Sequence, residues 1–212
     1  MSPAALRWLA FLDVVGVPLL IACYIWRLQF TARYSWVILV LWLTVSFLVH
    51  RDTPKTLGWR ADNIWPATRQ AAVFFGVCAV VLIAVGFVLG MPNRLPPHFI
   101  SFRRLWNYFA FCLLQEVALQ SLLNNRLMAL VENRWLSSLL AGAIFGALHW
   151  PNPVLVPVTF VGGVGMAWLF AQQRNIIPLA VGQAILGSLV WWVFPVSWHH
   201  GLRVGPGYYG LW

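Results

Sequence analysis

A carboxylate in the middle of an apolar run is the first feature of this sequence that could do chemistry. Residues 113–125 read LLQEVALQSLLNN, and Glu116 is one of only five acidic residues in the 212-residue chain. An acidic group at the centre of a bilayer costs roughly 2.5–3.5 kcal/mol on insertion scales. We therefore expect the chain either to offset this cost with polar partners or to use the carboxylate as a base.

Glu116 begins a polar stripe if the run is helical. Gln120 and Asn124 follow at intervals of four residues, which places the three side chains on one helical face. We expect that face to point into a helix bundle or a wet cavity. Amides in membrane helices typically form interhelical hydrogen bonds worth about 0.6 kcal/mol each. The carboxylate, in contrast, favours a functional role.

Two further polar islands lie downstream of this stripe. Residues 144–153 read IFGALHWPNP, with Phe145 one turn before His149, and residues 181–188 read VGQAILGS, with Gln183 one turn before Gly187. A single His at a helix end is more often an interfacial hydrogen-bonding group than a catalyst. An intramembrane Glu upstream makes the two interpretations of His149 about equal.

The composition indicates that these groups lie in a membrane. The chain is 61% hydrophobic and 9% charged, whereas soluble domains are about 25% charged. A net charge of +9 could indicate a nucleic-acid partner. However, Lys and Arg lie almost entirely between apolar segments, where basic loops set topology and contact anionic headgroups. We therefore expect a lipid bilayer as the partner, and no nucleic acid.

The apolar segments predict an all-α, polytopic membrane protein with about seven transmembrane helices. A crossing helix needs about 20 apolar residues. The candidate spans are residues 4–26, 34–49, 71–90, 105–123, 136–150, 154–171 and 177–194. Pro151 and Pro153 leave only a tight corner between the fifth and sixth. The polar stretch 51–70 is predicted to lie along the membrane surface, anchored by Trp59 and Trp65.

The first span is expected to remain uncleaved, although LIAC at 20–23 loosely resembles a lipoprotein cleavage site, because Asp13 interrupts the apolar run. Lys and Arg on alternate sides of seven spans number 8 on the N-terminal side against 6 opposite, which weakly favours a cytoplasmic N-terminus. The expected location is a bacterial inner membrane.

Placed side by side, the three islands resemble the three motifs of the CPBP family, the CAAX prenyl protease and bacteriocin-processing membrane endopeptidases. That family carries EExxxR, then FxxxH, then HxxxN or a variant. Here QEVALQ at 115–120, FGALH at 145–149 and QAILG at 183–187 occupy these positions. The resemblance covers about residues 104–195, and LGWR at 57–60 resembles the loop that precedes the family's core.

The resemblance implies a CPBP-like membrane-embedded core at 104–195, after N-terminal helices and an interfacial loop at 1–103 and before a polar tail at 196–212. It also implies an intramembrane glutamic endopeptidase that attacks a peptide or protein substrate with an activated water and needs no cofactor. The sequence departs from the pattern at several positions. Gln115 stands where the catalytic Glu is expected, Gln120 stands where Arg is expected, and the third motif has Gln183 and Gly187.

Two interpretations of this site remain open. In the first, Glu116 is the base and His149 orients the water or binds the oxyanion, with Gln115, Gln120 and Gln183 lining the cavity. Polar groups of the tail would replace the missing cations; these are His199, His200 and Arg203. In the second, the protein is a catalytically degenerate member that binds a membrane peptide or partner without cleaving it.

A transporter or metal site is a less favoured third class. The chain has five His residues, but no HExxH or closely spaced ligand set is present. Paired broken spans in two matching halves, typical of transporters, are not visible either. No metal is therefore expected.

Overall fold

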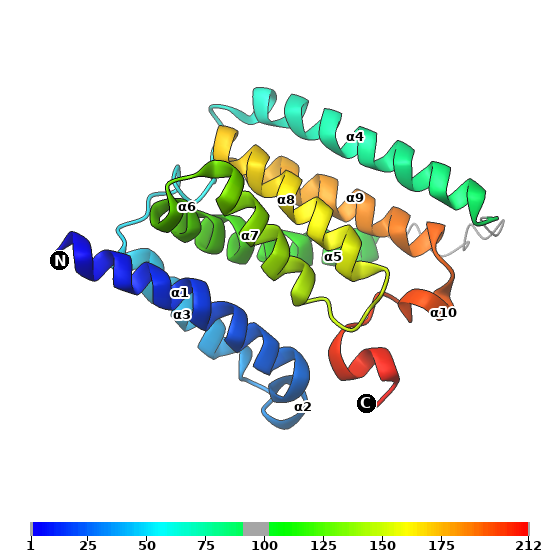
Figure 1. Ribbon diagram of the computed structural model, residues 1–212, viewed down its shortest axis with the longest axis horizontal. Coiled ribbons are helices and arrows are strands. Elements are labelled where there is room, and N and C mark those ends of the chain that lie inside the picture. The colour runs from blue at the N-terminus through cyan, green and yellow to red at the C-terminus, as the bar shows by residue number, and fades with distance from the viewer. Residues whose placement is uncertain (1, 91–101, 212) are drawn as a thin grey trace.

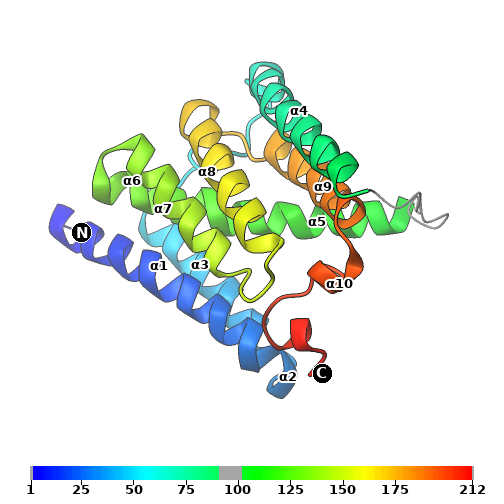
Figure 2. The ribbon, with the colours of Figure 1, turned by 45° about the vertical axis from the view of Figure 1, so that its right-hand side comes forward.

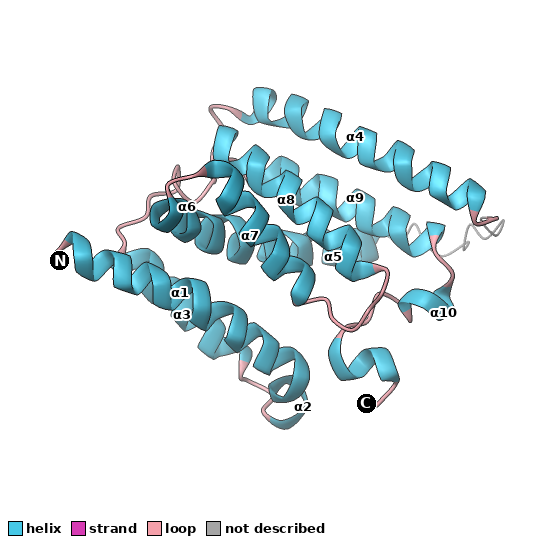
Figure 3. Ribbon diagram, viewed as in Figure 1, coloured by secondary structure: helices cyan, strands magenta, loops and turns pink. Residues whose placement is uncertain are grey.

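The computed structural model describes residues 2–90 and 102–211, and within these ranges it contains helices and loops but no strand (Figure 3). Each predicted span corresponds to helical structure, so the all-helical membrane fold is confirmed. In chain order the elements are α1 (Pro3–Cys23), the π-helix η1 (Tyr24–Leu28), α2 (Gln29–Thr31), α3 (Trp36–Val49), α4 (Ile64–Val88), α5 (Phe102–Glu116), the π-helix η2 (Val117–Asn124), α6 (Asn125–Val131), α7 (Arg134–Ala147), α8 (Leu155–Gln173), α9 (Ile177–Val193), α10 (Val196–His199) and the 3₁₀-helix η3 (Gly205–Tyr209).

Three of these helical segments are long and apolar enough to cross a membrane: Pro3–Thr31, Ile64–Val88 and Leu155–Gln173. Trp36–Val49 and Ile177–Val193 are shorter apolar helices. The membrane character of the chain is therefore confirmed, whereas the number of crossings stays a prediction.

The helix that carries Glu116 lies at the centre of the bundle. α5, η2 and α6 follow one another without a break, and Figure 2 shows α5 crossing behind α8 and α9. The π-helical part η2 is contacted by α1 and α3 on one side and by α7 and α8 on the other. α4 covers α9 at the far side of the bundle (Figure 1). Glu116 and the residues after it are thus enclosed by helices from both halves of the chain.

α7 and α8 pack against each other through glycines. A Cβ atom added to Gly142 would lie 2.8 Å from the Phe160 carbonyl oxygen, and one added to Gly163 would lie 3.0 Å from the Gly142 Cα. Small residues let membrane helices approach closely enough for backbone contacts, which helps to stabilise them where lipid is as apolar as the side chains. This pair fixes the position of His149, which follows α7 in the corner before α8.

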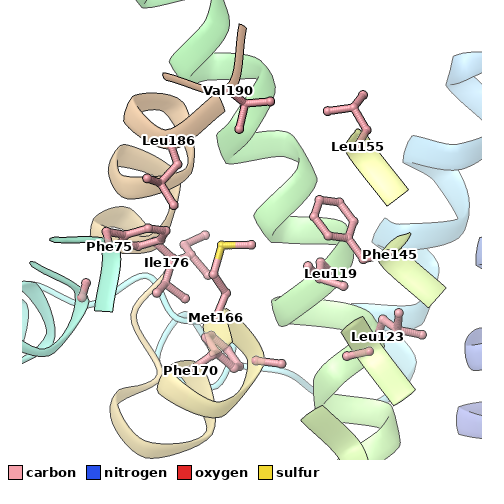
Figure 4. Close-up of a cluster of buried hydrophobic side chains, with 14 of the residues drawn as sticks. Phe75, Leu119, Leu123, Phe145, Leu155, Met166, Phe170, Ile176, Leu186 and Val190 are labelled. Atoms are coloured by element: carbon pink, nitrogen blue, oxygen red, sulfur yellow. The ribbon is translucent and has the colours of Figure 1, made fainter. Parts of the chain in front are cut away.

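The apolar core lies between η2 and the helices α4, α7, α8 and α9. Figure 4 shows Phe145 beside Leu119 and Leu123 of η2, and Phe170 near Ile176. Phe170 and Ile176 have no exposed surface, and Phe145 is 5% exposed. The second motif therefore contributes its aromatic ring to the core that packs around the first.

The loop between α3 and α4 packs onto the ends of the central helices. Ser121 donates its hydroxyl to the Leu57 carbonyl, and the Asn125 amide donates to the Thr56 carbonyl at 2.9 Å. Gly58 has φ +86°, a conformation that favours glycine, and its carbonyl accepts the Ile176 amide at 3.1 Å. The predicted anchors Trp59 and Trp65 are 43% and 77% exposed, so their rings are available to an interface.

Candidate active site

The α-helical geometry ends at Glu116. The next eight residues, Val117–Asn124, form the π-helix η2, whose inner residues from Leu119 to Asn124 are all buried. π-Helical turns are rare and frequently lie at functional sites, because the extra residue per turn redirects the side chains that follow. The sequence analysis assumed regular α-helix here, and the spacing of polar residues gave no signal of the change.

Glu116 itself is fully buried. Its exposed fraction is 0%, and neither carboxylate oxygen has a hydrogen-bond partner among the described residues. The Gln120 amide lies close enough to interact with the carboxylate, yet its Nε2 also lacks a well-formed hydrogen bond. Because unpaired polar groups are expensive to bury, this carboxylate is held in a position that packing alone does not favour.

The lower part of the predicted polar stripe is structural. The Asn124 amide donates to Gln120 Oε1 at 3.1 Å and to the Ala167 carbonyl at 2.9 Å, and Ser137 donates to Asn124 Oδ1 at 2.6 Å. These bonds join η2 to α7 and α8 in the bundle interior, where the stripe was expected to point. Asn124 therefore holds these helices together through hydrogen bonds. Gln120 lies between Asn124 and Glu116 in the stripe.

The first and third islands meet across α5 and α9. Gln183 Nε2 donates to Gln115 Oε1 at 2.8 Å, while Gln183 Oε1 is buried without a partner. One turn along α9, the Tyr108 hydroxyl occupies the space that a Cβ atom on Gly187 would need. The tyrosine belongs to the same α5 face as Gln115, and sequence reasoning did not single it out.

His149 is fixed by its own helix. Its Nδ1 is 2.7 Å from the Phe145 carbonyl, and the two rings meet edge to face with centroids 4.7 Å apart. A carbonyl only accepts, so Nδ1 carries the proton and Nε2 is left with a lone pair. No hydrogen bond or ion pair joins His149 to Glu116 within the described ranges, so the structure places these residues on separate elements around the core.

The three tail residues make bonds of their own. His199 is fully buried; its Nδ1 accepts the Gly201 and Leu202 amides, and its Nε2 donates to the Phe194 carbonyl at 3.1 Å. His200 stacks on Tyr208, and Arg203 is exposed. Among the described contacts, none from these residues reaches Glu116.

The tail is held by an asparagine that sequence reasoning did not select. Asn152, fully buried in the corner after α7, donates to the His199 carbonyl at 2.8 Å and to the Arg203 carbonyl at 2.9 Å. Its Oδ1 accepts the amides of Val154 and Leu155 at the start of α8. The polar tail therefore folds against the corner that carries His149.

A second buried cluster of charges lies away from the three motifs. Asp13 of α1 is 6% exposed and accepts Trp42 Nε1 at 2.9 Å, the Ser46 hydroxyl, and Arg126 Nε at 3.2 Å. Arg126 of α6 also donates to Asp52 at 2.6 Å. This cluster ties the N-terminal helices to the central helix. Its one sequence signal was Asp13 interrupting an apolar run, the same signal that drew attention to Glu116.

The geometry thus defines an all-helical membrane protein with a buried carboxylate at the end of an α-helical segment and a pair of amides beside it. Residues 97–189 match the family model described as type II CAAX prenyl endopeptidase Rce1-like. The CPBP resemblance is therefore confirmed over this segment, which is similar to a helical membrane family of the protease type. No curated protein and no solved structure matched the chain.

Proposed function

We propose that the protein is an intramembrane endopeptidase that cleaves a peptide or protein segment with a water activated by Glu116. The observation that carries this proposal is the fully buried carboxylate whose two oxygens have no hydrogen-bond partner in the described structure. It lies inside a segment that matches a protease family. A carboxylate shielded from bulk water is a stronger base, which suits it to take a proton from water.

The neighbouring amides can stabilise the negative charge that develops on the peptide carbonyl oxygen. Gln115 Oε1 is occupied by Gln183, which orients the Gln115 amide and leaves its Nε2 free to donate. A donor held in advance at a site of low dielectric stabilises an oxyanion without reorganisation. In the reaction, the water oxygen bonds to the peptide carbonyl carbon while Glu116 takes one water proton. The C–N bond then breaks with its electron pair going to nitrogen, and Glu116 passes the proton to that leaving amine.

The tautomer of His149 favours one of its two proposed roles, orienting the water or binding the oxyanion. With Nδ1 donating to the Phe145 carbonyl, Nε2 of the neutral ring accepts hydrogen bonds. Of the two roles considered for this residue, orienting the water fits this tautomer and binding the oxyanion does not. The buried ring nitrogens of His199 are both bonded to backbone groups, so His199 takes no part in the chemistry. No cofactor is required by this mechanism.

A second candidate function is peptide binding without cleavage. The observation that favours it is the Gln115–Gln183 hydrogen bond, in which two neutral amides satisfy each other at positions where the family pattern has an acid and a histidine. Such a pair can align a peptide backbone by exchanging amide hydrogen bonds. In this case the buried Glu116 would be protonated and structural.

Peptide cleavage in proteoliposomes distinguishes the two functions. A library of membrane-anchored and C-terminal peptides is offered to the wild-type protein, to Glu116→Gln and to the matched control Glu132→Gln. Glu132 is also a glutamate, but it is exposed and pairs with Arg7. Cleavage by wild type and control that is lost in Glu116→Gln supports the protease. Peptide retention by all three without cleavage supports binding, and cleavage by all three removes Glu116 from the mechanism.

A further inference from the structure

α7 begins and α8 ends at the same end of the bundle (Figure 1), and three arginines belong to this end by their place in the sequence. Arg134 is the first residue of α7, Arg174 follows the last residue of α8, and Arg60 lies in the loop that packs on this end. Burial lowers the pKa of the Arg174 guanidinium, and the charges of Arg134 and Arg60 lower it further against the opposing effect of Asp52. Arg174 therefore lies near both Arg134 and Arg60, as the packing of the start of α7 against the end of α8 also requires.

The nearby acids do not neutralise this group. Asp62 accepts Arg60 Nε at 3.0 Å, and Asp52 accepts Arg126 at 2.6 Å. Arg174 donates to the neutral Asn125 side chain at 2.9 Å. Within the described residues, neither Arg134 nor Arg174 forms an ion pair with an acidic side chain, and Asp52 acts on Arg174 only through its charge while its carboxylate is bonded to Arg126. Two guanidinium groups in this arrangement are complementary to an anion that accepts from both.

An aromatic pair lies beside the two arginines. Trp135 of α7 and Trp168 of α8 stack with ring centroids 3.9 Å apart and planes 17° apart, and Trp135 is 64% exposed. Trp is enriched where the hydrocarbon meets the headgroups, because its ring is apolar and its N–H is polar. We expect cations at the same end of the bundle as such a ring to lie near the depth of lipid phosphates.

We propose that Arg134 and Arg174, next to the stacked Trp135–Trp168 pair, form a binding site for the phosphate of an anionic lipid headgroup. The lipid chain would lie against the exposed ring of Trp135, and the two guanidinium groups would bind the phosphate. This inference does not depend on proteolysis. It adds a specific lipid contact to the bilayer in which the helices lie.

The test compares retention of phosphatidylglycerol and phosphatidylcholine by purified protein in neutral detergent, measured by native mass spectrometry. The variant is Arg134→Gln/Arg174→Gln. The matched control is Arg27→Gln/Arg33→Gln, which removes the same charge from two exposed arginines, one in η1 and one in the loop after α2. We expect wild type and control to retain phosphatidylglycerol preferentially, and the variant to bind it roughly 30-fold more weakly, since each of the two cations near the surface contributes about 1 kcal/mol.

Arg134→Gln alone keeps the test decisive if the double variant does not fold, because Arg134 is exposed and its removal leaves the packing intact. Equal retention of phosphatidylglycerol by Arg134→Gln and the control overturns the proposal. Competition by millimolar inorganic phosphate that displaces the lipid completely also overturns it, because the site would then recognise a free anion without the lipid.

Discussion

Asp13 and Glu116 are both carboxylates buried in a helical bundle, and the chain treats them in opposite ways. Asp13 accepts hydrogen bonds from an indole, a hydroxyl and a guanidinium. Glu116 has no well-formed hydrogen bond in the described structure, although it is the more deeply buried of the two. Burying a carboxylate without hydrogen-bond partners is costly. At Asp13 the donors offset this cost, whereas at Glu116 no donor among the described residues does so.

The largest expected effect is a loss of stability at Asp13, the carboxylate that has hydrogen-bond partners. Arg126→Leu leaves Asp13 and Asp52 buried without their shared cation, which should destabilise the protein by about 3–5 kcal/mol. Denaturant unfolding in detergent measures this change. The matched control is Arg7→Leu, which removes an exposed arginine paired with Glu132 and should change stability by about 1 kcal/mol or less. Equal losses in the two variants would mean that the cluster is not structural.

Neutralising each carboxylate with its isosteric amide sharpens the comparison. Asp13→Asn should lower stability, because Arg126 and the donors around it lose their acceptor charge. Glu116→Gln should leave stability unchanged or raise it, since no hydrogen-bonded partner is lost, while reducing kcat by about 100-fold or more. Unfolding and peptide cleavage are measured on both. A large stability loss in Glu116→Gln would show that this carboxylate is structural after all.

A smaller effect concerns the amide pair beside Glu116. A double-mutant cycle of Gln115→Ala and Gln183→Ala should give a coupling energy of about 0.6 kcal/mol in stability, the usual value for hydrogen bonds between membrane helices. If Gln115 also donates to the oxyanion, Gln115→Ala should lower kcat more than Gln183→Ala does. If the two variants change kcat equally and the coupling energy is the same, the Gln115–Gln183 pair has only a structural role.

The smallest expected effect is a pH dependence on the Asp13 side. Burial and the charge of Arg126 hold the pKa of His50 below its ordinary value, against the opposing effects of Asp13 and Asp52. Protonation therefore favours the unfolded chain. The contribution of neutral His50 to stability is fully present above the ordinary His pKa and is lost as pH falls through the lower folded pKa.

Replacing His50 with Gln should make stability less sensitive to acid over this interval than in wild type. Thermal unfolding across pH 5 to 8 measures the difference, with the exposed His200→Gln as control. A steeper acid sensitivity in His50→Gln than in wild type would contradict the sign argued here.

Some contacts around the candidate site could be read from residue types at helical spacing. Gln115 and Gln183 were expected to line one cavity; they form a hydrogen bond, while their place at a catalytic site stays a prediction. Phe145 and His149 were expected to be one turn apart, and their rings are in contact. These contacts follow from local periodicity, or from motifs whose order along the chain reflects the packing of three helices.

The charge cluster could not be read in the same way. Arg126 lies 113 residues from Asp13 and 74 from Asp52, and nothing local relates the three positions. Arg126 was counted with the basic residues between spans, yet it is 4% exposed. The burial of His199 and the hydrogen bonds of Asn152 were not predicted for the same reason, because their partners are backbone groups of a corner and tail that come together only after α7 and α8 pack.

The sequence by itself determined that the chain is helical, that it lies in a membrane, and that one carboxylate stands in an apolar helix, because hydrophobic periodicity and the cost of charge in lipid act on each segment alone. Only the tertiary structure decided which buried acid is partnered and which is not. That distinction depends on donors supplied by other helices, and their positions follow from packing over distances that no local pattern records.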